Sequence, residues 1–590
     1  MGSNGYWTLV DSEGKEHQIP ANGETALQGI RTHTHLTLQA PCSGKGRCGK
    51  CVIFSEESHD PELNDTGTEK PVLSCLLKPR EGERFRMPVK GDFQVSLNGL
   101  RIPQTLQPMV QITSITIPKQ NRESNPDLQC LLQEALGIDE PLPHSALQSF
   151  FPVNPLGYGS CKAVLYRGKP LIFLALDQPV VVCAVDIGTT TLALICVDAQ
   201  SGEVLGQASG LNNQSTWGAD VLSRIQSVRE GTATTRELQD VLVNQIETLI
   251  EKACPKGSTP VVLTVAGNTA MIHSIFGLYS GLLGESPFLT TARLPGDHQG
   301  RSLGFSRFPD LLVQGLPCLS AYVGADIAAG IVCADMDKKT DTILLLDVGT
   351  NGEMALSSGG NLVSCSTAAG PAFEGAHIHQ GIGGVPGAIE SVNVYDNTFV
   401  CTTIGNQNIA GICGSGIIDL MACLLNTGIV DEVGSICPEL VESYANCRWI
   451  ETDQGGELEF RFQDLGTLRF TGKDIREIQL AKAAIAAGIQ ILLESMALKP
   501  ENIDEFWIAG GFGGYINPIS AARIGLYPEG LLSKVISAGN TSLQGAYQSL
   551  MNRENFERMH RVEKRMQTID LASEPGFQDA YVESMIFPEG

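Results

Sequence analysis

Four cysteines near the start of the chain have the residue type and spacing of a metal–sulfur site. Cys42, Cys48 and Cys51 are separated by five and two residues, and Cys75 follows after a further 23. Three close thiolates and one remote thiolate suit a two-iron cluster, because each iron takes two sulfur ligands from the protein. Glycines between the first three cysteines permit a loop that approaches the cluster closely. We therefore expect these four cysteines to hold one [2Fe–2S] cluster.

Zinc is the alternative ion for this cysteine pattern. The Cys48-Gly49-Lys50-Cys51 stretch alone would suit zinc about as well as iron. Zinc ribbons usually contain two Cys-x-x-Cys pairs, however, and no second pair of this kind lies near Cys75. The whole motif resembles plant-type and adrenodoxin-type ferredoxins, which implies a β-grasp domain over residues 1–95. Most other cysteines, including Cys183 and Cys196, stand singly in apolar runs and are expected to be small buried hydrophobic residues.

Two later segments combine an aspartate, a glycine turn and hydroxyl or amide side chains. The first runs from Asp186 to Thr191 and the second from Asp347 to Glu353, each directly after an apolar strand. Backbone N–H groups in such turns can hold phosphates while the aspartate binds Mg²⁺, usually through water. The turn residues expected to contact a nucleotide are Gly188, Thr189, Thr190, Thr191, Gly349, Thr350, Asn351 and Gly352. The alternative is that these glycines only make tight turns in an α/β scaffold.

A glycine-rich loop follows the second turn at a distance. It contains Gly510, Gly511, Phe512 and Gly513 and begins at the end of a short predicted strand, and the chain has no GxxxxGK[ST] phosphate loop. The two turns and this loop together look like the nucleotide-binding core of the actin, sugar-kinase and heat-shock-chaperone superfamily. That resemblance implies two lobes that close on ATP, with the late loop against the adenosine. Glu353 and Asp220 are the candidates to orient the attacking water.

The combination of the two halves resembles the reductive activators of corrinoid-dependent enzymes. The resemblance is strongest in three stretches: Ala368–Gly375, Gly411–Gly416 and Ala509–Gly513. The resemblance implies ATP-dependent reduction of cob(II)alamin to cob(I)alamin on a corrinoid protein of a methyltransferase system. It also implies a [2Fe–2S] cluster, ATP and Mg²⁺ as cofactors, an unidentified low-potential electron donor, and a homodimer. Residues 364–371 are a candidate docking face for the corrinoid protein.

Two other functions remain open on the sequence. Activators of 2-hydroxyacyl-CoA dehydratases share the ATP-binding core but carry a [4Fe–4S] cluster between two subunits and lack a ferredoxin domain. The second alternative is a nucleotide-switched binding module whose cluster senses redox state. The four cysteines Cys42 to Cys75 argue against the first alternative and leave the second untested.

Composition and charge exclude several classes of partner. The 590 residues are 42% hydrophobic and 18% charged, as expected for a folded multidomain protein. A formal net charge of −24 argues against nucleic acid, which requires a basic surface. The N-terminus lacks the features of a signal peptide, and the longest apolar stretch, Pro179–Ile187, is too short to span a membrane. We therefore expect a cytoplasmic protein in a reducing compartment.

The predicted elements indicate an α/β multidomain protein with a two-lobed, actin-like C-terminal part. We expect four segments: residues 1–95, a linker over 96–125, a small α/β module over 126–178, and the ATP-binding domain over 179–590. Apolar and alternating runs predict strands at 7–10, 17–19, 171–176, 180–186, 191–198, 342–347, 353–357 and 505–508. Helical patterns cover 25–32, 127–136 and 472–498. The strand–turn–strand unit therefore occurs twice, about 160 residues apart.

Overall fold

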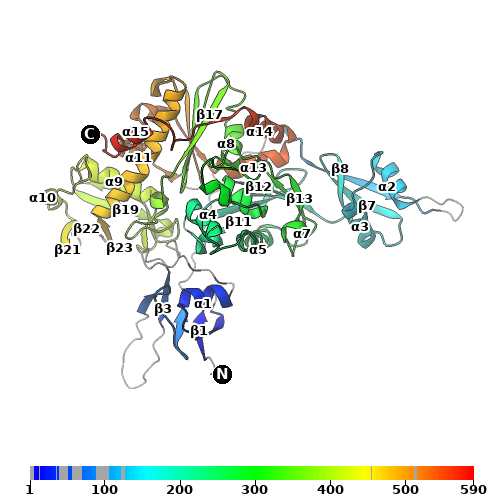
Figure 1. The fold of residues 1–590 in the computed structure, drawn as a ribbon, viewed down its shortest axis with the longest axis horizontal. Helices are drawn as coiled ribbons and strands as arrows, with labels where there is room; N and C mark the ends of the chain where they lie inside the picture. The colour runs from blue at the N-terminus through cyan, green and yellow to red at the C-terminus, as the bar shows by residue number, and fades with distance from the viewer. Residues whose placement is uncertain are drawn as a thin grey trace.

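In the computed structural model of this chain, the described residues are 5–11, 14–34, 36, 38, 51–55, 70–87, 105–120, 127–218, 220–452, 455–510 and 515–589. Two large lobes form the body of the molecule, a small N-terminal unit lies beneath them, and a second small unit extends to one side (Figure 1). The architecture is α/β throughout, as predicted.

The N-terminal unit is a five-stranded sheet covered by one helix. The strand order is β2-β1-β5-β3-β4, with bounds β1 Tyr6–Val10, β2 Glu16–Pro20, β3 Val52–Ser55, β4 Lys70–Leu73 and β5 Arg84–Arg86. Helix α1 (Ala26–His33) begins with a capping box between Thr25 and Gln28, which satisfies N–H groups at its start. Trp7 and Phe85 pack edge to face beneath the helix, with ring centroids 5.8 Å apart. The predicted first two strands and this helix are confirmed.

The lateral unit is a three-stranded antiparallel sheet with two helices. Its elements are β6 Val110–Ile117, β7 Gly159–Tyr166, β8 Lys169–Leu174, α2 Leu128–Leu136 and α3 His144–Val153. Strand β6 lies within residues 96–125, the range expected to be a linker, and pairs with β7 along its whole length. The β-branched residues of that range thus form a strand because β7 presents an edge to pair with. Helix α3 was not predicted from the sequence.

The two lobes are built on six-stranded sheets that share the order of five strands, with the sixth strand at opposite edges, β13 beyond β14 and β26 beyond β17. The first runs β11-β10-β9-β12-β14-β13, and the second runs β26-β17-β16-β15-β24-β25. In each, a three-strand antiparallel meander is followed by two parallel strands on the other side of its first strand. The strands are β9 Val180–Ile187, β10 Thr191–Asp198, β11 Val204–Leu211, β12 Thr259–Gly267, β13 Asp297–Gln299, β14 Leu312–Gly315, β15 Ile343–Val348, β16 Gly352–Ser358, β17 Asn361–Thr367, β24 Glu505–Ala509, β25 Val535–Gly539 and β26 Gln567–Thr568. The predicted repeat of the strand–turn–strand unit is confirmed.

Helices cover both lobes, and one helix of the first lobe comes from the C-terminal part of the sequence. Helix α13 comes from the C-terminal part of the chain but packs on α8 and on strands β9 and β12 of the first lobe. The helices of the two lobes, α13 included, are α4 Val221–Arg229, α5 Thr235–Ala253, α6 Thr269–Ile275, α7 Gly300–Leu303, α8 Ala325–Cys333, α9 Gly414–Asn426, α10 Pro438–Val441, α11 Gly472–Ser495, α12 Pro518–Arg523, α13 Thr541–Met551, α14 Arg553–Arg565 and α15 Phe577–Glu583. Two three-stranded sheets, β18 Ala388–Tyr395 with β19 Thr398–Thr403 and β20 Gly411–Ile412, and β21 Cys447–Thr452 with β22 Gly455–Phe462 and β23 Gly466–Thr471, complete the second lobe. The first lobe therefore depends on a helix that lies in sequence between β25 and β26 of the second lobe's sheet.

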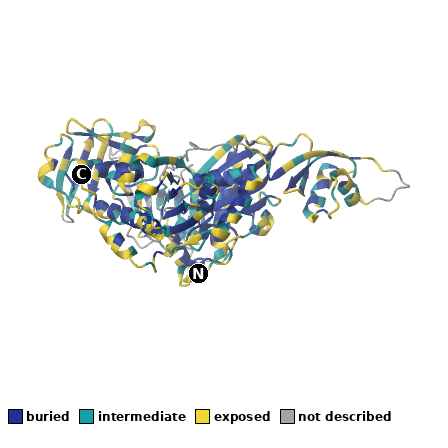
Figure 2. Cartoon of the chain, turned by 90° about the horizontal axis from the view of Figure 1, so that it is seen from above, coloured by how far each residue is buried: buried dark blue, intermediate teal, exposed yellow. Residues whose placement is uncertain are grey.

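The buried residues concentrate in the two lobes (Figure 2). Helix α11 is long and apolar enough to cross a membrane, but 72% of its apolar window is buried inside the second lobe. Its apolar face packs on β16 and β17, so it is the core helix of this lobe. The range predicted for this helix ended three residues later, at 498.

Candidate nucleotide site and cysteine turn

The two acidic glycine turns face each other across one cavity. The cavity has a volume of about 910 Å³ and is lined by both lobes. Its lining includes these predicted residues: Asp186, Gly188, Thr189, Thr190, Thr191, Asp347, Gly349, Thr350, Asn351, Glu353 and Gly510. Gly352 and Asp220 were also predicted but are not among the lining residues. Gly511, Phe512 and Gly513 lie outside the described residues.

The first turn is held tightly by its own backbone. The Gly188 N–H donates to the carbonyl of Thr191 at 2.9 Å. A Cβ atom at Gly188 would lie 2.7 Å from that carbonyl oxygen, so only glycine fits there. Asn212 fixes the turn from outside, because its backbone N–H donates to the Thr190 carbonyl and its side chain donates to the Gly188 carbonyl.

A buried glutamate joins the two turns. The Thr190 hydroxyl donates to Glu374 Oε2, and the Thr350 hydroxyl donates to Glu374 Oε1 at 2.9 Å. The two threonine oxygens lie 3.3 Å apart. Burial raises the pKa of Glu374, and the hydrogen bonds from the threonines oppose that shift. Glu374 belongs to a stretch that the sequence singled out only for its family resemblance, so its position between the turns could not be foreseen.

Arg224 supports the first turn from within the first lobe. Its Nη2 donates to the Thr189 carbonyl at 2.6 Å and its Nε donates to the Gly218 carbonyl at 3.0 Å. Burial lowers the pKa of this guanidinium to about 10, with Asp220 and Glu374 opposing the shift. A charged arginine in this position adds positive potential next to the place where phosphates would bind.

Four buried carboxylates gather at the floor of the cavity: Asp186, Asp326, Asp347 and Glu353. Burial is the main cause that raises the pKa of each, and repulsion from neighbouring carboxylates adds to it for Asp326, Asp347 and Glu353. The pKa of Asp326 rises to about 7. Asp326 stands in the first turn of α8 and was not among the predicted site residues.

The donor set of this cluster fits a hard divalent cation. Glu353 Oε1 is buried and has no hydrogen-bond partner among the described residues. Asp186 is held from the C-terminal segment, because Ser542 donates to its Oδ1 at 2.7 Å and Asn540 donates to its Oδ2 at 2.8 Å. Like-charged oxygens that converge without a cation raise one another's pKa, and Mg²⁺ is the ion that prefers such oxygens next to phosphates.

Asp220 occupies a different environment from Glu353, the other candidate to orient the attacking water. Its carboxylate accepts the Ser223 N–H at 2.7 Å and forms a capping box at the start of α4. This arrangement stabilises the helix terminus. The geometry thus shows a capping role for Asp220, whereas Glu353 lies in the cavity.

The glycine-rich loop begins in contact with the second turn. Gly510 has φ +107°, and a Cβ atom there would lie 2.6 Å from the Val348 carbonyl oxygen and 2.7 Å from Asp347 Oδ1. Glycine is therefore required at this position for the loop to start beside Asp347.

Two of the four predicted cluster ligands are described, and their backbones are neighbours. Cys51 precedes β3 and Cys75 follows β4, both side chains being buried. The Ser74 N–H donates to the Cys51 carbonyl at 2.8 Å, which brings the two cysteine segments together as a shared cluster requires. Cys42 and Cys48 lie outside the described residues.

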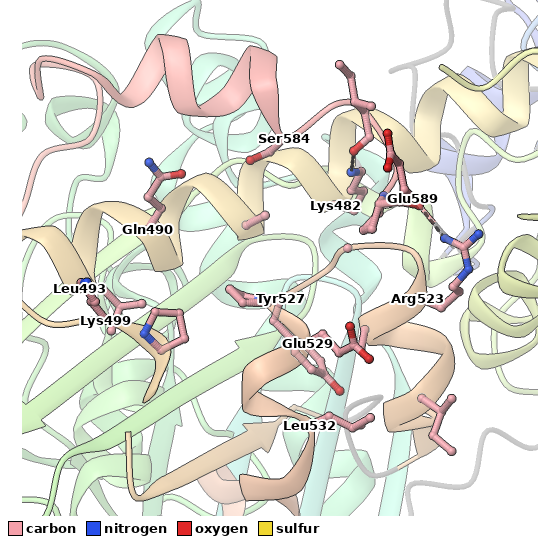
Figure 3. A pocket seen from close by; sticks show the side chains of 18 of the residues that line it. Lys482, Gln490, Leu493, Lys499, Arg523, Tyr527, Glu529, Leu532, Ser584 and Glu589 are labelled. Carbon is pink, nitrogen blue, oxygen red and sulfur yellow. Dashed lines mark hydrogen bonds between the residues drawn. The ribbon is translucent and has the colours of Figure 1, made fainter. Parts of the chain in front are cut away.

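A second cavity of about 1030 Å³ lies within the second lobe (Figure 3). Two of the cations that line it hold the C-terminal segment: Lys482 Nζ donates to the Ile586 carbonyl and Arg523 Nη1 donates to the Pro588 carbonyl. Burial lowers the pKa of Lys482 to about 8. The cavity contains neither turn nor any of the four clustered carboxylates, so the smaller cavity is the candidate nucleotide site.

Half of the predicted docking face lies inside a sheet. Of the segment 364–371, residues 364–367 belong to β17, which pairs with β16 along this stretch and with β26 at Ser364, whereas Ala368 is exposed and residues 368–371 stay a prediction. Ser364 is fully buried and hydrogen-bonds Thr568. Small polar residues here satisfy the interior of a sheet, which their composition alone does not reveal.

Comparisons with known proteins agree on one family. Residues 341–590 match the model described as the C-terminal domain of RACo, the ASKHA domain, and residues 181–339 match the RACo middle region. The chain is 30% identical to "Corrinoid activation enzyme RamQ" of Eubacterium limosum, over 97% of this chain and 98% of that protein. It is 27% identical to "[Co(II) methylated amine-specific corrinoid protein] reductase" of Methanosarcina barkeri, over 45% and 50% of the two chains. The solved structure "Reductive activator for corrinoid,iron-sulfur protein" is similar over 99% of this chain and 98% of its own, with 28% identity and a TM-score of 0.74.

Proposed function

The chain belongs to the RACo family, and we propose that it is an ATP-dependent reductase that returns an inactive corrinoid protein from cob(II)alamin to cob(I)alamin. A cluster held by Cys42, Cys48, Cys51 and Cys75 would supply the one electron that converts cobalt(II) to cobalt(I), and a low-potential donor would reduce it again. The corrinoid protein would belong to a methyltransferase system, and the enzyme would act in the cytoplasm as a homodimer.

The observation that carries the nucleotide half of this proposal is the convergence of both turns and four carboxylates on one cavity. The ASKHA match over residues 341–590 supports nucleotide binding there. Asp186, Asp347 and Glu353 would hold the shell of a Mg²⁺ ion, which supplies charge neutralisation for the phosphates when bound. The N–H groups and hydroxyls of the two turns would bind phosphate oxygens, and Glu353 would orient the attacking water.

Glu374 suggests how ATP changes the relation between the lobes. Its carboxylate accepts one hydrogen bond from each turn, as phosphate oxygens would. An incoming polyphosphate competes with this carboxylate for the same two hydroxyls and repels it. The geometry therefore supports a change in lobe contacts when nucleotide enters and leaves.

Helix α1 provides a route between the nucleotide site and the cysteine turn. At its start, the N–H groups of Ala26 and Leu27 donate to the carbonyls of Leu77 and Ser74, on either side of Cys75. At its end, Arg31 Nη2 donates to the Thr216 carbonyl of the 3₁₀ turn η1 (Asn213–Thr216). Asn212, which begins η1, is hydrogen-bonded to the first phosphate turn. One helix of about 12 Å thus spans from the cysteine turn to the ATP-binding lobe.

The energetic need for ATP follows from the chemistry of cobalt. A ferredoxin-type [2Fe–2S] cluster held by Cys42, Cys48, Cys51 and Cys75 would supply electrons at about −400 mV. A shortfall of about 100 mV against cob(II)alamin costs about 2.3 kcal/mol for one electron. Nucleotide-driven closure can bias a two-state equilibrium by about 5 kcal/mol, which is enough to cover that shortfall.

The test is a spectroscopic reduction assay with the full chain. Titanium(III) citrate reduces the enzyme, a cob(II)alamin-bearing corrinoid protein is added, and the cob(I)alamin spectrum is followed with and without ATP. We expect ATP-dependent formation of cob(I)alamin. No ATP-dependent change with corrinoid partners, despite ATP hydrolysis, would overturn the proposal in favour of the redox-sensing module.

The same assay tests the route through α1. Arg31→Gln should retain most ATP hydrolysis and lower the rate of cob(I)alamin formation about 10-fold, because the contact with η1 is lost. His33→Gln, two residues further along α1, is the matched control and should change neither the rate of ATP hydrolysis nor the rate of cob(I)alamin formation. Equal reduction by the Arg31→Gln variant and the wild type would exclude this route.

A further inference from the structure

Three cysteine sulfurs converge in the first lobe, away from the nucleotide cavity. They belong to Cys183 in β9, Cys196 in β10 and Cys254 at the end of α5, and all lie within 4.8 Å of one another. Cys183 and Cys196 are direct partners across the β9–β10 pair. Both are buried, as the sequence predicted. The third sulfur comes from a helix end far along the chain, so no sequence motif joins the three.

The spacing of these sulfurs matches a single metal ion. The sulfur atoms of Cys183 and Cys254 are 3.8 Å apart. An ion with metal–sulfur bonds of about 2.3 Å in tetrahedral geometry places its sulfurs about 3.8 Å from each other. Clusters with several irons spread their cysteine ligands over a larger core. The group is therefore compact enough for one ion and too compact for a multi-iron cluster.

The surroundings favour a soft cation. Three thiolate donors select thiophilic ions such as Zn²⁺ and Cu⁺ and disfavour Mg²⁺ and Ca²⁺, which prefer oxygen. The last carbonyls of α5, at the helix end next to Cys254, carry partial negative charge that stabilises a cation. Cys254 is partly exposed while its two partners are buried, which leaves a path for an ion to enter from that side.

We propose that Cys183, Cys196 and Cys254 bind one thiophilic cation, Zn²⁺ or Cu⁺, that fastens the β9–β10 hairpin to the end of α5. The ion binds when the thiols release their protons, and no electron is transferred. The site lies three residues before Asp186, so it would stiffen the strand that carries the first phosphate turn. This site is independent of the proposed reductase function.

Metal analysis of the intact chain tests the proposal. Zinc, copper and iron are measured per chain by mass spectrometry for the wild type, Cys254→Ser and Cys437→Ser. Cys437 is the matched control because it is partly exposed like Cys254 and is not part of the sulfur group. We expect about one zinc or copper in the wild type and in Cys437→Ser and none in Cys254→Ser, with iron unchanged in all three. If Cys254→Ser contains as much zinc or copper per chain as Cys437→Ser, the proposal is overturned.

Titration of metal-free, reduced protein separates the two ions and guards against a folding defect. Zn²⁺, Cu⁺ and the spectroscopic probe Cd²⁺ are added separately, and thiolate-to-cadmium absorbance is followed. Cys254→Ser should bind on the order of 100-fold more weakly than Cys437→Ser, and its Tm should no longer rise with metal. Matched affinities, or a Cys183–Cys254 disulfide found by mass mapping of the anaerobically purified chain, would exclude the site.

Discussion

The two lobes share one scaffold but carry different charges at equivalent positions. Asp186 is the next-to-last residue of β9 in one sheet, and Asp347 is the next-to-last residue of β15 in the other. Across the hairpin, Asp186 pairs with Ala193 in the first lobe, whereas Asp347 pairs with Glu353 in the second. Asp186 accepts hydrogen bonds from Asn540 and Ser542. Burial raises the pKa of Asp347, and repulsion from Asp326 and Asp186 adds to that shift.

This difference teaches that duplication of a fold does not duplicate its chemistry. In the first lobe, the neutral donors Asn540 and Ser542 hold Asp186 in place beside the first phosphate turn. The second lobe places the carboxylates of Asp347 and Glu353 opposite each other, and a bound cation would relieve their repulsion. We therefore assign the larger share of cation binding and water positioning to Asp347 and Glu353 and the smaller share to Asp186, and four predictions test this assignment.

The largest effect is expected from Asp347→Asn. Loss of this carboxylate from the cation shell should lower ATP hydrolysis and ATP-dependent cobalt reduction roughly 1000-fold or more, because charge stabilisation worth several kcal/mol is lost. Asp186→Asn should cost less, since Asn540 and Ser542 can still hold the amide in place. Steady-state phosphate release measures both, with the exposed Asp240→Asn as control. A larger loss in Asp186→Asn than in Asp347→Asn would reverse the assignment.

The next effect concerns the two residues predicted to orient water. Glu353→Gln should lower kcat for ATP hydrolysis roughly 100- to 1000-fold with little change in KM, because it removes the acceptor for the attacking water. Asp220→Asn should keep kcat within about twofold and lower the stability by about 1 kcal/mol, as expected for a helix cap. Kinetics and urea unfolding of both variants separate the roles. A strong kcat defect in Asp220→Asn would restore it as a catalytic residue.

A smaller effect of opposite sign is expected from Glu374→Gln. Removing the charge that joins Thr190 and Thr350 should tighten ATP binding about 5- to 10-fold, because the phosphates no longer repel a carboxylate. Calorimetric titration with a non-hydrolysable ATP analogue measures this change. The neighbouring Glu390→Gln, which also lines the cavity, is the control. Weaker binding in Glu374→Gln would show that the carboxylate supports the bound state.

The smallest effect is on stability and its dependence on pH. The folded pKa of Asp326 is raised from 3.8 to about 7, so folding binds a proton that the unfolded chain has released. Its stabilising share is complete below pH 4 and is lost as the pH rises to about 7. In Mg²⁺-free buffer the Tm should therefore fall across this window, and Asp326→Asn should raise the Tm at pH 8 by about 2–4 °C. Differential scanning fluorimetry measures both, and Mg²⁺ with an ATP analogue should flatten the slope of the wild type. A Tm in Asp326→Asn equal to or below that of the wild type at pH 8 would contradict this origin.

The sequence by itself determined the parts whose signals are local. Strand–turn–strand units with Asp186 and Asp347, the α1 start at Thr25 and the α11 start near Gly472 were all predictable, because apolar runs, tight glycine turns and caps are written in neighbouring residues. The cysteine spacing from Cys42 to Cys75 is local in the same sense and remains a prediction for its two undescribed members.

Only the tertiary structure decided which distant residues share a site. Glu374 between the turns, Asp326 among the carboxylates, and Asn540 and Ser542 on Asp186 come from segments with ordinary local patterns. The sulfur group of Cys183, Cys196 and Cys254 is of the same kind. Their convergence depends on how α8, α13 and α5 pack on the sheets, and packing is a property of the whole fold that no spacing in the sequence records.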